Sequence, residues 1–156
     1  MKKLSFVLFL LVLVMTACTE KKLIELPDDV PAFVKGSDFK EINWEQKAEA
    51  FGRGMIGNEN KSGVIGAGMP SVNGQKWMWH LWGVEPTELT VVGYERKTET
   101  VHKILTQGWS VPMGGSNNGA DAHAPSSVSF PDQGEWAILL YADEELFDIL
   151  VYDIKN

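Results

Sequence analysis

The stretch Gln75–Gly83, which reads QKWMWHLWG, carries bulky side chains at almost every position. Trp77, Trp79 and Leu81 share one parity, and Met78, His80 and Trp82 share the other. Successive side chains of a β-strand point to opposite faces, so this pattern predicts a strand with bulk on both faces. A helix fits less well, because Gly83 and Pro86 end the pattern after about eight residues. We therefore expect a central strand of a β-sandwich here.

The C-terminal end contains the clearest hairpin. Residues 135–142 and 146–154 are both rich in β-forming residues, and residues 143–145 join them. One parity of the first strand carries Trp136, Ile138 and Leu140. Asp148 interrupts the pattern of the last strand, and a β-bulge near its middle would restore the agreement between the two strands.

Shorter candidate strands precede this hairpin. They are residues 47–51, 63–67, 89–97, 101–106 with an extension over 107–111, and 127–130. Residues 112–126 contain three glycines and two prolines, so we expect a long irregular loop there. Seven or eight short strands without strand–helix alternation predict an all-β, antiparallel β-sandwich.

The N-terminal residues have the features of an export signal. Two lysines precede an apolar run, residues 4–14, that is too short to span a bilayer comfortably. Small residues then lead to Cys18, which resembles the lipidated cysteine of a bacterial lipoprotein signal; an ordinary secretory signal is the alternative. We expect a signal peptide over residues 1–17, a tether over 18–40 and a folded domain over 41–156. The apolar residues Leu23, Ile24, Leu26 and Phe33 could still pack on that domain.

The cysteine count and the net charge exclude a disulfide-stabilised domain and disfavour nucleic-acid binding. Cys18 is the only cysteine, so no intrachain disulfide can form and the core must stabilise the domain. Removing residues 1–17 removes two lysines and no acid, which changes the net charge from −7 to −9. An acidic domain is a poor candidate for binding nucleic acid.

Three segments carry a family resemblance: KWMWHLWG, NNGADAHAPSS and FPDQGEWAILLYADEELFDILVYDI. Together they resemble a family of uncharacterised lipoproteins of Bacillus-type bacteria, over roughly residues 44–156. The resemblance implies an immunoglobulin-like sandwich and no activity. It also implies a glycine at the position of Asp148.

The predicted long loop contains several side chains that could bind a ligand or a cation. Asn117, Asn118, Asp121 and His123 are candidate ligand-binding residues, and the last two could each contribute one bond to a cation. Two ligands are too few to define a metal site. The alternative is a loop whose polar side chains satisfy its own backbone. Ser126 and Ser127 add the residue types of a hydrolase, but no G-x-S-x-G turn accompanies them.

Six tryptophans suggest either a sugar-binding surface or a core. We expect Trp79 and Trp136 in the core and leave Trp44, Trp82 and Trp109 open. His80 is expected to be packed or hydrogen-bonded within the sandwich.

The sequence thus predicts an extracytoplasmic, non-enzymatic binding module without a cofactor, anchored to the cell membrane by lipid on Cys18. Its partner would be an envelope protein or a wall or sugar polymer. The alternative is a metal-dependent or hydrolytic envelope enzyme that uses residues 117–127.

Overall fold

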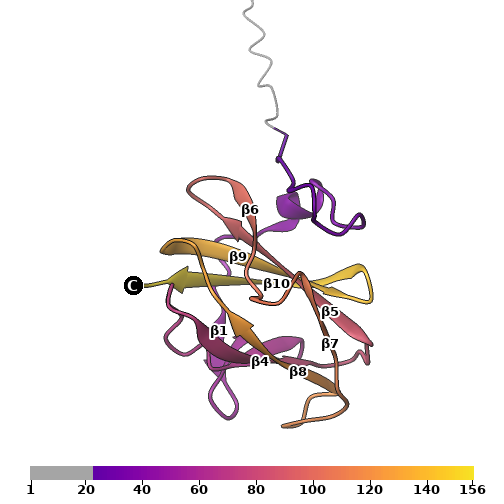
Figure 1. The fold of residues 1–156 in the computed structure, drawn as a ribbon. Helices are drawn as coiled ribbons and strands as arrows, with labels where there is room; N and C mark the ends of the chain where they lie inside the picture. Colours follow the sequence, from indigo (N-terminus) through magenta and orange to yellow (C-terminus); the bar gives the residue numbers. More distant parts are fainter. Residues whose placement is uncertain (1–22) are drawn as a thin grey trace, which may run out of the picture.

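The computed structural model describes residues 23–156, which form two antiparallel sheets packed face to face (Figure 1). The first sheet has the order β1-β2-β3-β4-β8 and the second β10-β9-β5-β6, with β7 paired to β5. The elements are the 3-10 helix η1 Asp38–Glu41 and the strands β1 Glu49–Phe51, β2 Met55–Asn58, β3 Ser62–Ile65, β4 Gln75–Leu81, β5 Glu88–Glu95, β6 Thr100–Lys103, β7 Ser110–Pro112, β8 Ala122–Val128, β9 Gly134–Ala142 and β10 Glu145–Ile154. The predicted all-β sandwich is confirmed, with ten strands in this part of the chain rather than seven or eight. The predicted signal peptide and Cys18 lie outside the described residues.

The tryptophan-rich strand β4 crosses the core as predicted. Trp77, Trp79 and Leu81 face inward, and none of them is more than 1% exposed. Trp136 on β9 is also fully buried and meets them from the opposite sheet, within the same cluster. The prediction that Trp79 and Trp136 are core residues is confirmed, and Trp77 joins them.

The outer face of the second sheet is apolar as well, and the N-terminal segment covers it. The covering side chains are Ile24, Leu26, Val30, Phe33, Val34, Phe39, Ile42 and Trp44. The ring of Phe33 lies 5.6 Å from that of Tyr141, and the ring of Phe39 lies 4.9 Å from that of Tyr94. Tyr141 Oη also donates a hydrogen bond to Asp38 (3.0 Å). Residues 24–40 are therefore part of the folded domain and not a tether, because their apolar side chains bury the outer face of this sheet.

Strand β8 occupies residues that the sequence assigns to an irregular loop, so that prediction is wrong for residues 122–126. The misleading residue is Pro125. His123 and Ser127 have the same parity, and their backbone groups bond to Gly114 and Thr106, on the side away from β4. The nitrogen of Pro125 therefore faces the sheet edge, where a missing N–H breaks no bond of the β4–β8 ladder. The strand expected at 127–130 is only the end of β8.

The C-terminal hairpin β9–β10 forms as predicted, but its bulge lies between Leu146 and Asp148, near the start of β10. Asp148 is buried and accepts hydrogen bonds from Ser62 Oγ (2.6 Å) and Asn58 Nδ2 (3.0 Å). Lys61 Nζ lies 3.4 Å from its carboxylate. Because Asn58 and Ser62 belong to the first sheet, Asp148 ties the two sheets together at the position where the family resemblance has a glycine.

Replacing Phe39 by alanine tests the role of the N-terminal cover. We expect Phe39→Ala to lower the free energy of unfolding by ~3 kcal/mol, as for other large aromatic deletions. Chemical denaturation of the domain measures the loss, and Lys40→Ala, an exposed neighbour, is the control. Equal stability of the two variants would show that residues 24–40 behave as a tether after all.

Candidate functional site

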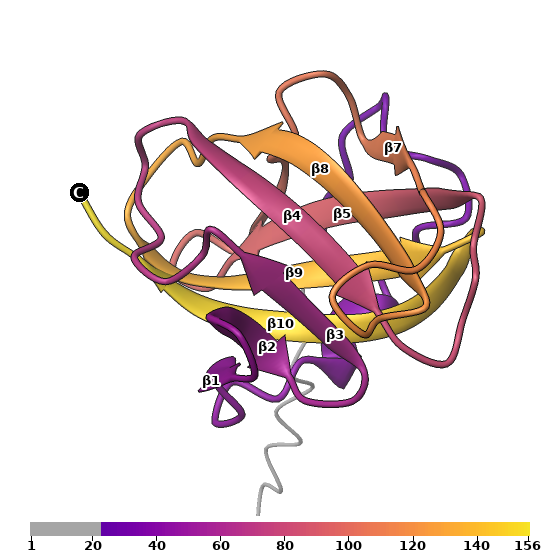
Figure 2. The ribbon, with the colours of Figure 1, turned by 90° about the horizontal axis from the view of Figure 1, so that it is seen from below.

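The segment between β7 and β8 holds Asn117, Asn118 and Asp121, three of the four polar residues that the sequence singles out, and it folds back against the ends of β4 and β8 (Figure 2). The fourth, His123, is the second residue of β8. Asn117 and Ala120 exchange backbone hydrogen bonds of 3.1 and 2.9 Å. Asn118 and Gly119 between them have positive φ angles of 51° and 86°. Such a pair is typical of a type I′ turn, which favours Asn-Gly. That signal was available in the sequence. Trp82 Nε1 donates to the carbonyl oxygen of Gly119 (2.8 Å) and ties the turn to the end of β4.

Asp121 and His123 bond to different backbone groups and do not converge. Asp121 Oδ2 accepts a hydrogen bond of 2.6 Å from the Gly83 N–H. His123 Nδ1 donates to the carbonyl oxygen of Gly115 (2.6 Å), and its ring lies against Gly114. Each side chain therefore satisfies a backbone group of a neighbouring loop. This arrangement corresponds to the structural alternative left open by the sequence.

His80 lies beneath this segment, on the outer face of β4, and is completely buried. Its Nδ1 donates to the carbonyl oxygen of Met78 (3.1 Å), and its Nε2 accepts from Asn118 Nδ2 (3.2 Å). Asn118 Nδ2 also donates to Asn117 Oδ1. Burial lowers the pKa of His80, which favours the neutral ring that this pattern requires. Asn117 and Asn118 thus hold the turn over a buried, neutral histidine, the packed role predicted for His80.

In the part of the chain that the structure describes, Ser126 and Ser127, the serines considered for a hydrolase, do not bond to a histidine or a carboxylate. The hydroxyl of Ser126 accepts from Trp79 Nε1 (2.8 Å), and that of Ser127 accepts from Lys76 Nζ (2.7 Å). A hydrolase would instead need a serine hydroxyl bonded to a base. Within residues 23–156, no three His, Cys, Asp or Glu side chains gather closely enough to hold a metal ion.

A groove of about 540 Å³ runs beside β8 and extends to the segment that leads into β7. Its apolar lining comes from Ile65, Trp77, Met78, Leu105, Val111, Pro112 and Pro125. Ile65, Met78 and Pro125 are cross-strand neighbours, and they face away from the core because Val64, Trp79 and Ala124 face inward. The volume lies in the range of small-molecule sites.

Polar groups complete the lining of this β7–β8 groove. They are the side chains of Lys76, Gln107, Ser110, Ser126 and Ser127, and Gly66 is the remaining lining residue. Lys76 is the only charged residue among them, and no acidic side chain lines the groove. None of the four residues proposed from the sequence lines it either. The groove is assembled from segments far apart in the chain, so sequence reasoning alone had no means of finding it.

Comparison with known proteins agrees with this architecture. The sequence pattern of a domain of unknown function, DUF4871, matches residues 33–152. The chain belongs to the DUF4871 family. The crystal structure of a "putative lipoprotein" from Bacillus anthracis has the same fold, with a TM-score of 0.64 and 21% sequence identity over 80% of this chain and 96% of that one. No curated protein matches the chain.

The resemblance to uncharacterised lipoproteins of Bacillus-type bacteria is thereby confirmed. The DUF4871 match begins at residue 33, within the N-terminal cover of the second sheet, and it includes every strand from β1 to β9. Among residues 23–156, no helix has the length and apolar character needed to cross a membrane.

The double variant Asp121→Ala with His123→Ala separates the structural role from a recognition role. We expect it to lower the free energy of unfolding by ~1–3 kcal/mol, because two backbone groups of the DUF4871 domain lose their partners. Denaturant unfolding measures the loss, with Glu85→Ala as the control at an exposed nearby position. An unchanged midpoint would mean that both side chains are available to a ligand.

Proposed function

We propose that this chain is a lipid-anchored, non-enzymatic binding module of the bacterial cell surface that holds an apolar ligand in the β7–β8 groove. The observation that carries this proposal is the position of the groove. It lies on the outer face of the first sheet, whereas the N-terminal segment covers the outer face of the second.

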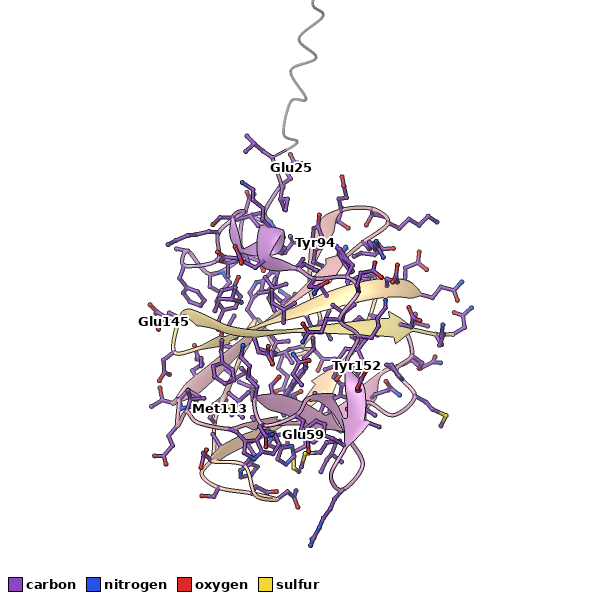
Figure 3. All side chains as sticks on the ribbon, turned by 180° about the vertical axis from the view of Figure 1, so that it is seen from behind. Glu25, Glu59, Tyr94, Met113, Glu145 and Tyr152 are labelled. Atoms are coloured by element: carbon purple, nitrogen blue, oxygen red, sulfur yellow. The ribbon has the colours of Figure 1, made fainter. Side chains whose placement is uncertain are left out.

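The anchor supports the proposal through chain length. Leu23 follows Cys18 by five positions, with four residues between them, so even a fully extended connection spans at most about 18 Å. The side of the second sheet would therefore lie next to the membrane. In Figure 3 Glu25 lies where the chain enters the domain, and Glu59 and Met113 lie on the far side. The strands β4 and β8, which contribute to the groove, also lie on the side opposite the N-terminal segment (Figure 1), so a ligand could reach the β7–β8 groove without meeting the lipid surface.

The polar contacts of residues 117–127 favour binding over catalysis. The side chains of Asp121 and His123 bond to backbone groups, and those of Ser126 and Ser127 bond to a tryptophan and a lysine. None of these four bonds joins a nucleophile to a base. The groove has a mainly apolar lining, which suits a binding site better than a centre for hydrolysis. A partner among envelope proteins or wall polymers would have to present an apolar group to it.

Substituting the predicted lipidation site tests the anchor. We expect the full chain with Cys18→Ser, produced in a Bacillus-type host, to incorporate no labelled fatty acid and to remain unprocessed or be released. Metabolic labelling with an alkyne fatty acid and fractionation of the cells measure both effects. Equal labelling of the variant and the parent would contradict the anchor.

A charge placed on the floor of the groove tests the binding surface. Pro125 is exposed at a sheet edge, so Pro125→Asp should fold normally. We expect it to weaken the binding of 1-decanol, a neutral apolar probe, at least about fivefold, since a hydrated carboxylate replaces apolar surface. Isothermal titration calorimetry on the soluble domain measures binding, and Met69→Asp is the control because Met69 is exposed outside the groove. No heat of binding in the parent would refute the groove as a binding site.

A further inference from the structure

We propose that the β7–β8 groove recognises a monocarboxylate with an apolar body, and that Lys76 binds the carboxylate. This inference rests on the proposed function and assigns the chemical class of its ligand.

The charge of the groove lining is opposite to that of the chain as a whole. The chain carries 21 acidic and 14 basic residues, yet the groove is lined by one lysine and no acid. Lys76 is exposed and forms no ion pair within residues 23–156. Its ammonium group is therefore an uncompensated positive charge beside an apolar floor. A ligand group of opposite charge is the complement of such a site.

Lys76 and Ser127 also have hydrogen-bond donors that are free to bind a ligand. Lys76 Nζ donates one hydrogen to Ser127 Oγ (2.7 Å), which leaves two of its three hydrogens for another acceptor. The Ser127 hydroxyl accepts this bond and keeps its own hydrogen to donate. The two groups are cross-strand neighbours on β4 and β8 and face the same side of the sheet. Together they offer donors to both oxygens of a carboxylate.

The number of cations favours a carboxylate over a phosphate. A phosphate monoester carries a charge near −2 at neutral pH and three strong acceptor oxygens, and it is usually held by several cations. One ammonium and one hydroxyl match the single charge and two oxygens of a carboxylate. The adjacent apolar row of Ile65, Met78 and Pro125 would then hold the ligand's body.

The apolar lining and the lysine make separable contributions, so three probes of equal chain length test the assignment. Decanoate, 1-decanol and decylamine share an apolar body and differ in the charge of the head group. We expect the soluble domain to bind decanoate more tightly than 1-decanol and decylamine more weakly. Lys76→Gln should weaken decanoate binding about fivefold and leave 1-decanol unchanged, because an exposed charge-assisted contact contributes little more than that. Lys76→Glu should reverse the order of decanoate and decylamine.

Titration calorimetry at low salt measures all three affinities, and Lys40→Gln, on the opposite side of the domain, is the matched control. Equal binding of the three probes, or equal loss of decanoate binding in the Lys40 and Lys76 variants, would overturn the carboxylate assignment while leaving the groove as a binding site. Absence of binding by every probe would instead overturn the proposed function itself.

Discussion

The second sheet is apolar on both faces, and a sheet of this kind must be covered twice. On β9, Trp136, Ile138 and Leu140 face the first sheet, while Leu139 and Tyr141 face the other way. The first sheet covers the inner face and residues 24–44 cover the outer one. With one cysteine in the whole sequence, no disulfide can replace this burial. The N-terminal segment is therefore part of the core, although it contains only one short 3-10 helix and no strand.

The sequence predicted the elements in which apolar and β-forming residues recur over many consecutive positions. The strand β4 and the hairpin β9–β10 have such patterns, and both form where expected. The N-terminal cover has no period of its own, because its apolar residues are fitted to a surface formed elsewhere. The unbroken apolar run from Trp136 to Tyr141 is the signal from which the need for a second cover could have been predicted, but it was not used. Pro125 prevented the prediction of β8. A proline excludes a central strand but not an edge strand, and the sequence does not show which strand lies at an edge.

Residues 117–123 illustrate a different limit. The sequence singled out Asn117, Asn118, Asp121 and His123 as candidate ligand-binding residues, and they lie in one short turn and strand. Their partners, however, include Gly83 and His80, which come from β4 and the chain after it. Such partners determine whether a polar side chain is available to a ligand or is already hydrogen-bonded within the protein. The β7–β8 groove depends even more on register, because Ile65, Met78 and Pro125 meet only when three strands pair correctly.

The double cover also determines which surface is left for function. If Cys18 carries the lipid as proposed, the anchor is attached to the segment that buries the outer face of the second sheet. A long tether would let the domain turn freely, whereas a connection of four residues to a packed segment would restrict its orientation. The membrane side is then occupied by structural contacts. With that anchor, the same contacts that complete the core would hold the outer face of β3, β4 and β8 away from the membrane, and the β7–β8 groove with Lys76 lies on that face.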